Sequence, residues 1–439
     1  MGRRVEFVGS TTFMELHLKN IGKIAEATVE IKGITVIGGE NNTGKSTVGK
    51  SLFSVYNGFC EIQRQIHREK VLGIRNALRF LYGNVHYIKD SGQVKGDKDF
   101  SEEILAKAED YKRKPELLKD EIEIMFRLGS EQPQRFRERI NIKDIVSRII
   151  DILKISDKDI FDSILNKRLN IEFSGQLLNI YSESEGIISL KVQNEDLSVT
   201  VSENIALANR LDYVLHAEAI YIDDPFVLDD VDFWYIIGER SDTDHHAHLI
   251  YKLLQGGHNT SVVDELVAET KFGNIYEKIS SVCDGDIIQQ KNNELGYQLK
   301  NSDRILNLKN LSTGLKTFMI IKTLLTNGII EPDGIVILDE PEIHLHPEWQ
   351  LLFAEIIVLL NKEFGTYVLL NTHSPYFLRA IQVYSAKYGR NDVCRYYLSE
   401  NREKGAYIMD VTENVDKIFA KLASPLQKLE DERWNIDLL

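Results

Sequence analysis

One stretch near the start of the chain constrains the fold more than any other. Residues 39–46 read Gly-Glu-Asn-Asn-Thr-Gly-Lys-Ser and match the spacing G-x-x-x-x-G-K-[ST] at every fixed position. The apolar run at 33–38 predicts a buried strand directly before it, and the pattern from Lys45 to about Leu81 predicts helix. The sequence therefore predicts a strand, a glycine-rich loop and a helix in succession, as in an α/β fold.

This loop has the composition of a phosphate-binding site. Its glycines let backbone N–H groups turn inward, and the helix start adds unpaired N–H groups and a positive dipole end. Lys45 is expected to reach the β- and γ-phosphates, and the Ser46 hydroxyl to ligate Mg²⁺. The candidate nucleotide-binding residues of the loop are Asn41, Asn42, Thr43, Gly44, Lys45, Ser46 and Thr47. ATP and Mg²⁺ are the expected cofactors, and the competing interpretation is a glycine turn with a chance lysine.

The composition limits the classes of function. The chain has 439 residues and a net charge of −14, from 53 basic and 67 acidic residues. This charge disfavours a surface built mainly for nucleic acid, although it leaves a local basic groove open. Three scattered cysteines form neither a metal spacing nor a disulfide framework, and no apolar run is long enough to span a bilayer. A cytoplasmic protein without a membrane segment or secretory signal is expected.

Two segments in the second half predict further parts of a nucleotide site. Ser312 and Gly314 lie where a helix is expected to begin, and both are candidate phosphate contacts. An ordinary helix cap is the alternative for this pair. The apolar run 334–338 predicts a strand that ends in Asp339 and Glu340. Asp339 is expected to hold Mg²⁺, and Glu340 to act as general base on the attacking water.

A last strand, predicted at 366–371, leads to His373. This histidine follows Asp339 by 34 residues (373 − 339) and is expected to hydrogen-bond the γ-phosphate and Glu340. Glu340 and His373 are thus the candidate catalytic residues. A lone histidine at a strand end is otherwise a structural residue.

Together, these motifs resemble those of ABC-type ATPases. The run Glu-Pro-Glu-Ile-His-Leu-His-Pro at 340–347 is similar to the RecF, SMC and OLD branch, and especially to compact ATPases of bacterial anti-phage defence. The resemblance covers about 1–60 and 300–439. It implies an ABC-type P-loop NTPase with a mixed sheet, an antiparallel β subdomain and an inserted helical lid. It also implies a homo-oligomer built on a head-to-tail dimer, with ATP between the Lys45 loop of one chain and Ser312 of the other.

Two departures from the family pattern matter. Thr313 stands where many members have glycine, which leaves Ser312 in place but bears on its contact across the dimer. Only 66 residues follow His373 (439 − 373), too few for the Toprim-type nuclease domain of OLD proteins. A separate effector protein, such as a nuclease or toxin, is therefore expected.

The pattern divides the chain into four segments. The expected domains are 1–85, the first part of the ATPase; 86–170, a helical insertion; 171–260, β-rich with a linker; and 261–439, the second part of the ATPase. Strands are expected at 171–173, 187–192 and 197–201 within the third segment.

The middle of the chain also holds charged groups without an assigned role. Basic groups lie at 112–114 and at Arg135, Arg137 and Arg139, where a solvated helical face is favoured over a surface that binds a partner or nucleic acid. The acidic pair Asp230 and Asp232 has a metal-like spacing, although a solvated loop is favoured. A second metal-like group consists of Asp242, Asp244, His245, His246 and His248. We interpret it as a polar helix start, because neighbouring histidines on a helix point apart.

The sequence thus favours an ATPase that controls a separate effector in defence against phage. The alternative is a DNA-binding ATPase of the repair or chromosome type, for which DNA is a partner. A third interpretation, the motor subunit of a membrane transporter, agrees less well with the His-Leu-His-Pro variant and the large insertion.

Overall fold

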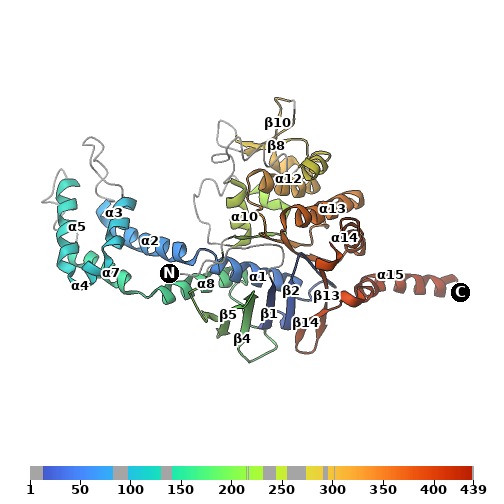
Figure 1. Cartoon of the computed structure of the whole chain (residues 1–439), viewed down its shortest axis with the longest axis horizontal. Coiled ribbons are helices and arrows are strands. Elements are labelled where there is room, and N and C mark those ends of the chain that lie inside the picture. Colours follow the sequence, from blue (N-terminus) through green and yellow to red (C-terminus); the bar gives the residue numbers. More distant parts are fainter. Residues whose placement is uncertain are drawn as a thin grey trace. The chain divides into compact units, whose positions relative to one another are not determined.

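The computed structural model describes residues 13–82, 97–129, 141–213, 215, 217–230, 244–254, 273–289, 295–300 and 302–437. The chain forms two compact units, a larger one of residues 1–60 with 165–439 and a helical one of residues 61–164 (Figure 1). None of the helices in the described part of the chain is both long and apolar enough to cross a membrane. Each unit is described by itself below.

A mixed sheet organises the larger unit. Within the described residues it has eleven strands, in the order β6 (Ile205–Ala208), β5 (Glu195–Ser202), β4 (Gly186–Val192), β1 (Met14–Ile21), β2 (Ile24–Ile31), β14 (Gly405–Asp410), β13 (Cys394–Arg402), β3 (Ile34–Gly39), β12 (Tyr367–Thr372), β11 (Ile335–Asp339) and β7 (Ala219–Ile222). The first five strands of this order pair antiparallel, whereas β13, β3, β12, β11 and β7 run parallel. A smaller antiparallel sheet holds β8 (Asp286–Gln289), β9 (Leu295–Gln298) and β10 (Ile305–Asn307). The predicted α/β class, with a mixed sheet and an antiparallel part, is confirmed.

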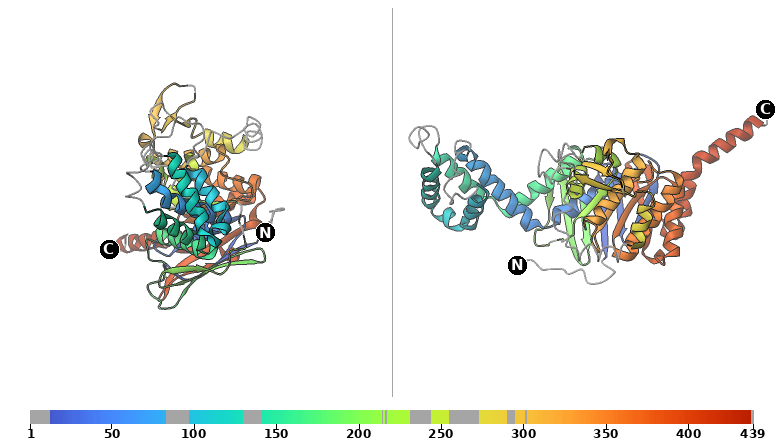
Figure 2. Two further views of the ribbon diagram at one scale, coloured as in Figure 1. Left: turned by 90° about the vertical axis from the view of Figure 1, so that its left-hand side faces the viewer. Right: turned by 90° about the horizontal axis from the view of Figure 1, so that it is seen from above.

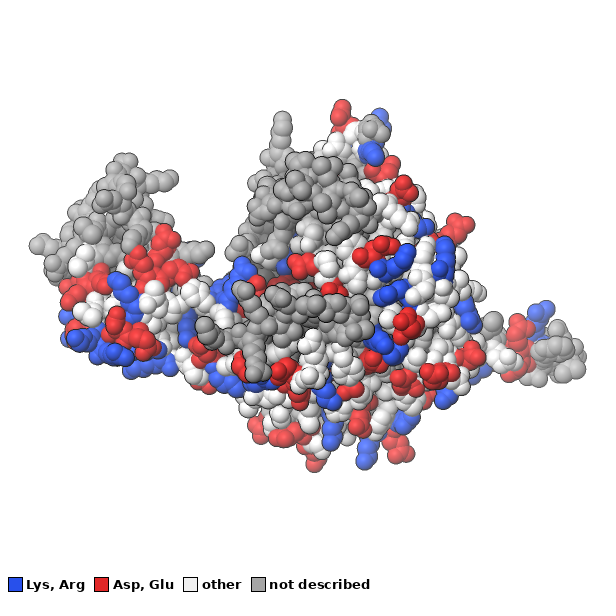
Figure 3. Space-filling model, viewed as in Figure 1, with Lys and Arg blue, Asp and Glu red and all other residues white. Residues whose placement is uncertain are grey.

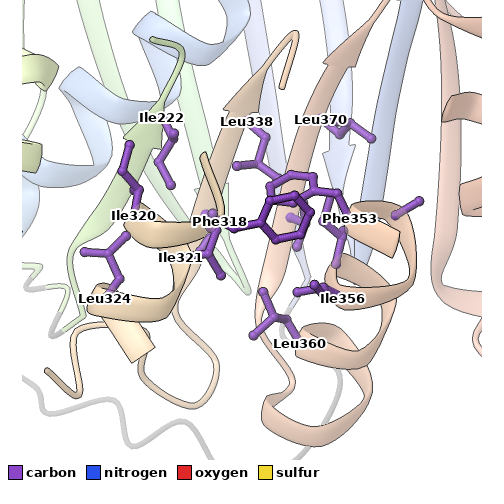
Figure 4. Close-up of a cluster of buried hydrophobic side chains, with 14 of the residues drawn as sticks. Ile222, Phe318, Ile320, Ile321, Leu324, Leu338, Phe353, Ile356, Leu360 and Leu370 are labelled. Atoms are coloured by element: carbon purple, nitrogen blue, oxygen red, sulfur yellow. The ribbon is translucent and has the colours of Figure 1, made fainter. Parts of the chain in front are cut away.

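The parallel strands are buried on both faces, so their sequences are apolar without alternation. All residues of β3, β7, β11 and β12 are buried. One face packs on α10 (His245–Leu254), α12 (Thr313–Thr326), α13 (Pro347–Phe364) and α14 (Pro375–Lys387). Figure 4 shows Phe318 of α12 and Phe353 of α13 against Leu338 and Leu370 of the sheet. This core fixes the ends of the parallel strands.

The opposite face packs on α1 (Lys45–Phe59), the helix that follows the glycine-rich loop. Gly49 permits this close approach, because a Cβ atom there would lie 3.1 Å from both Ile337 and the Tyr221 hydroxyl. Further along α1, the Asn57 side chain accepts from the Ala219 N–H at 2.7 Å and donates to the Ala219 C=O at 2.9 Å. Since β7 is the last strand of the described sheet, Asn57 takes the place of a neighbouring strand there.

The strand predicted at 171–173 is wrong. The helix α8 (Asp157–Glu172) continues to this point, with Phe161, Leu165 and Leu169 fully buried at helical spacing. Three residues that alternate apolar and polar fit a helix end as well as a strand, so the local pattern did not decide between them. The strands predicted at 187–192 and 197–201 are confirmed as β4 and β5, and the short strand β6 was not predicted.

The helical unit has a core of its own. It contains α2 (Ile62–Tyr82), α3 (Asp97–Ala106), α4 (Ala108–Arg113), α5 (Pro115–Gly129) and α7 (Ile142–Lys154), which pack as a bundle in Figure 2. Ile74, Leu78, Ile104, Leu118 and Ile149 are fully buried in it. Helix was predicted for this region and is confirmed where residues are described, whereas the basic group at 135–139 lies outside them. The predicted division into four domains stays a prediction.

The Asn57 contact predicts a measurable stability loss. Replacing Asn57 by alanine leaves the buried N–H and C=O of Ala219 without these two bonds, which costs about 2–4 kcal/mol. We expect Asn57→Ala to lower the urea midpoint of unfolding, followed by circular dichroism, while Asn414→Ala at an exposed position does not. Equal midpoints for both variants would contradict the role given to Asn57.

Candidate nucleotide-binding site

The glycine-rich loop connects β3 to α1 and has the backbone shape of an anion cradle. Asn42 and Gly44 have positive φ angles of 63° and 82°, and α1 begins at the next residue, Lys45. A Cβ atom at Gly44 would lie 2.5 Å from Ile24, so only glycine fits here. Backbone N–H groups in such a turn at a helix start favour a bound phosphate.

Several side chains hold the loop in this shape. The Thr43 hydroxyl donates to the Glu40 carbonyl at 2.8 Å, and the Ser399 hydroxyl of β13 donates to the Thr43 carbonyl at 2.5 Å. Lys23 and Asn401 both donate to the carbonyl of Asn42, at 3.3 and 3.2 Å. Ser399 and Asn401 lie more than 350 residues away in sequence, so no local pattern marks them as part of the site.

Lys45 is buried across the mouth of the loop. Its ammonium group donates to the carbonyls of Gly39 at 3.3 Å and Glu40 at 2.8 Å, and lies 3.5 Å from Glu340 Oε1. Ser46 is exposed and Thr47 partly exposed at the start of α1, where a ligand can reach their hydroxyls. The fold therefore brings the loop lysine and the predicted general base together although 295 residues separate them (340 − 45).

Asp339 is buried at the carboxyl end of β11. Its two oxygens accept hydrogen bonds from the Tyr221 hydroxyl at 2.8 Å and the Asn371 amide at 3.0 Å. Burial raises the pKa of Tyr221 well above its ordinary value, and the nearby Asp339 charge adds to this, so the phenol remains a donor. Tyr221 lies on β7 and Asn371 on β12, the two strands that flank β11. A polar residue at the end of a neighbouring strand could have marked both as partners of Asp339.

Glu340 lies beside His373 in a backbone conformation that is unusual for glutamate. Its φ angle is 52°, and its N–H donates to the Asn371 carbonyl at 2.9 Å. A left-handed residue other than glycine costs on the order of 1 kcal/mol, which the surrounding bonds offset. Glu340 Oε1 lies 3.1 Å from His373 Nδ1, without the alignment of a hydrogen bond. Lys45, Glu340 and His373 thus converge.

Glu342 is a part of the site that the sequence analysis missed. It is buried, and its Oε1 accepts from the Thr372 hydroxyl at 2.5 Å and from the backbone N–H groups of His373 at 3.2 Å and Ser374 at 3.3 Å. These bonds fix the turn that carries His373. Burial raises the pKa of Glu342, although its hydrogen bonds oppose the change. The second glutamate of the Glu-Pro-Glu run was the signal that could have revealed it.

Ser312 and Gly314 lie apart from the loop, at the start of α12. Ser312 is exposed and makes no side-chain cap bond. A Cβ atom at Gly314 would lie 3.0 Å from both the His344 carbonyl and the Trp349 ring. A hollow of about 390 Å³ is lined by Ser312, Thr313, Gly314, His344, His346 and Trp349. In the described part of the chain, no hydrogen bond or ion pair joins Ser312 or Gly314 to the phosphate loop.

The other sequence candidates contribute little to this site. Asp232 and Asp242 lie outside the described residues, and Asp230 follows the short η1 helix (Pro225–Asp229). The predicted helix start is found at His245, but the neighbouring histidines do not point apart, because His245 and His246 both contact Asp223.

The fold and these contacts define the class of the protein. A phosphate loop, an Asp-Glu strand end and a histidine lie at the carboxyl ends of adjacent parallel strands, as in a P-loop ATPase. Residues 34–379 match the family model described as "AAA domain, putative AbiEii toxin, Type IV TA system", which is 346 of 439 residues (379 − 34 + 1). The chain belongs to this family.

Solved SMC heads are distantly similar to the chain. The SMC head domain from Thermotoga maritima is 12% identical, over 91% of this chain and 99% of that one, with a TM-score of 0.37. An SmcHead bound to the C-winged helix domain of ScpA is 10% identical, over 91% and 98% of the two chains, with a TM-score of 0.43. These values are too low to carry a functional role from one protein to the other.

The raised pKa of Glu342 predicts how the stability of the protein changes with pH. Its folded pKa is raised, so the folded protein keeps a proton that the unfolded chain releases as the pH rises above about 4.5. The native protein therefore loses stability over this range, whereas Glu342→Gln, which keeps the acceptor oxygen, does not. We expect the melting temperature of Glu342→Gln relative to the native protein to rise between pH 4.5 and 7.5.

Glu342→Ala is the matched variant, because it removes the acceptor itself. We expect it to lower the unfolding free energy by about 2–4 kcal/mol at pH 4.5, since three donors lose their partner. The deficit should be smaller at pH 7.5, because the native protein itself loses stability over this range. A pH-independent difference between Glu342→Gln and the native protein would contradict the raised pKa of Glu342.

Proposed function

We propose that this ATPase binds ATP and Mg²⁺ between two chains arranged head to tail, hydrolyses the ATP and thereby controls a separate effector protein. The observation that carries the proposal is the split between the two groups of residues. Lys45, Glu340 and His373 converge in one chain, whereas the exposed Ser312 and the buried Gly314 make no hydrogen bond or ion pair with them in the described part of the chain. A second chain that supplies Ser312 would complete the site.

The residues fit the expected cofactors. The loop from Asn41 to Thr47 offers a cradle of backbone N–H groups, and the Lys45 ammonium at its mouth would pair with the β- and γ-phosphates. Ser46 and Asp339 would hold Mg²⁺, which neutralises charge that develops on the phosphates. The bonds from Tyr221 and Asn371 to Asp339 keep its carboxylate oriented for this task.

Glu340 would act as the general base and take a proton from the water that attacks the γ-phosphate. Its left-handed backbone and the bond from its N–H to Asn371 set the direction of the side chain. His373 would orient Glu340 and reach the γ-phosphate, while Glu342 holds the turn on which the histidine sits. Ser312 and Gly314 of the second chain would close over the same phosphate at the start of α12.

The family description supports a role in defence. It names a putative AbiEii toxin and a type IV toxin–antitoxin system, which agrees with the anti-phage role that the motifs imply. In such a role the closing and opening of the ATP-bound dimer would switch an effector, for example a nuclease or toxin on another chain.

A DNA-binding ATPase is the second candidate. Basic side chains gather over the end of the helical unit that holds α4, as Figure 3 shows, and Lys112, Arg113 and Lys114 lie there. Elsewhere on the visible described surface, acidic and basic groups are interspersed. An ATPase rate that DNA stimulates, with a steep dependence on salt, would favour this candidate.

Glu340→Gln tests the proposed mechanism. The amide cannot take a proton from water, so we expect ATP turnover to fall at least about 100-fold while ATP binding remains. Because hydrolysis reopens the proposed dimer, the variant should remain dimeric, or a multiple of a dimer, with ATP and Mg²⁺. The measurements are phosphate release and mass in solution by light scattering.

Lys45→Ala is the control, because it removes the ammonium that would pair with the phosphates. It should bind ATP weakly and remain a monomer under every nucleotide condition. A Glu340→Gln protein that binds ATP but stays monomeric would overturn the shared site.

A further inference from the structure

A cluster of one carboxylate and two histidines lies between the end of β7 and the start of α10. His245 Nε2 is 2.9 Å from Asp223 Oδ2, and His246 Nε2 is 2.8 Å from Asp223 Oδ1. One ligand atom from each of the three side chains lies within 4.8 Å of the other two. We call Asp223, His245 and His246 the histidine cluster; the nucleotide mechanism uses none of them.

A second carboxylate orients the buried histidine from behind. Glu172 Oε2 lies 2.7 Å from His245 Nδ1, and Glu172 Oε1 accepts the backbone N–H of His245 at 2.6 Å. The Glu172 side chain is fully buried, with an exposed fraction of 0%. It therefore holds the ring so that Nε2 faces Asp223 and His246. A carboxylate on the outer nitrogen of a histidine is the usual support of a metal ligand.

We propose that the histidine cluster binds one divalent transition-metal cation, with Zn²⁺ as its preferred ion. Two imidazole nitrogens and one carboxylate oxygen are ligands that Zn²⁺ favours, and three protein ligands leave a position for water. Bonds of about 2.0–2.2 Å to one ion place ligand atoms roughly 3–3.5 Å apart. The two contacts to Asp223 are already close to this spacing, so small side-chain movements suffice.

An ion-pair network without metal is the competing explanation. In that state burial opposes the charge on His245, but the Asp223 and Glu172 carboxylates outweigh it and raise the pKa of His245 to about 9. An ion pair needs only one histidine beside a carboxylate, whereas here two histidines approach the two oxygens of the same carboxylate. The His246 side chain is also 42% exposed, which gives a cation a path from solvent.

The cluster is distinct from the predicted Mg²⁺ site but adjoins it. The ring of His245 stacks on Tyr221 with a centroid distance of 4.4 Å, and the Tyr221 hydroxyl donates to Asp339. A cation bound to His245 would hold this ring, and with it the tyrosine, in place. Two imidazole nitrogens favour a transition metal, whereas the oxygen ligands of the nucleotide site favour Mg²⁺, so the two sites differ in the ion they prefer.

The test is metal binding by the full-length protein without nucleotide. The protein is stripped with EDTA, dialysed against micromolar ZnCl₂ and analysed for zinc per chain, and CoCl₂ is used to record a visible spectrum. His246→Gln and Asp223→Asn each remove a ligand, and the partly exposed His246 allows substitution without loss of the fold. His67→Gln is the matched control, because His67 pairs with a single carboxylate, Glu102, at 2.6 Å.

We expect about one zinc per chain in the native protein and in His67→Gln, since each chain has one cluster in its described part. His246→Gln and Asp223→Asn should bind zinc at least about tenfold more weakly and lose the cobalt spectrum. Native protein that retains no zinc, or a His246→Gln protein with native affinity and an unchanged circular dichroism spectrum, would overturn the proposal.

Discussion

The register of three parallel strands is the constraint on which the site depends. β12 pairs with β3 on one side and β11 on the other, with Thr372 opposite Gly38 and Asn371 opposite Asp339. The phosphate loop, the Asp-Glu pair and the histidine turn therefore leave the sheet at one edge. A slip of one residue would turn the side chains of a strand to its other face and separate these groups. The apolar core on α12 and α13 is what prevents such a slip.

Neighbouring carboxylates at this edge acquire different properties from their surroundings. Asp339 is buried and fixed by two donors, whereas Glu340 is a quarter exposed and lies between Lys45 and His373. Glu342 is buried again and serves as an acceptor for the backbone that carries His373. The environment, not the residue type, thus distinguishes three acids within four positions, for which we propose metal binding, base chemistry and support of the fold.

Much of this arrangement could be predicted from the sequence, because strand ends leave a local signal. The apolar run into Asp339 and the loop spacing around Lys45 marked the strands and their order along the chain. The partners Tyr221 and Ser399 could not be found in this way, since they reach the site from 118 and 356 residues away. The helix end at Glu172 and the convergence of His245 with His246 on Asp223 likewise depend on tertiary packing that no local pattern encodes.

The central claim, a site shared by two chains, is tested most directly by mixing two inactive variants. Lys45→Ala lacks the loop lysine, and Ser312→Arg blocks the surface that would close over the partner's phosphate. A dimer that pairs one chain of each kind contains one intact site of two, so the account predicts that mixing restores ATPase activity, to about a quarter of the native rate where the chains pair at random. Two folded variants that remain inactive after mixing would contradict it.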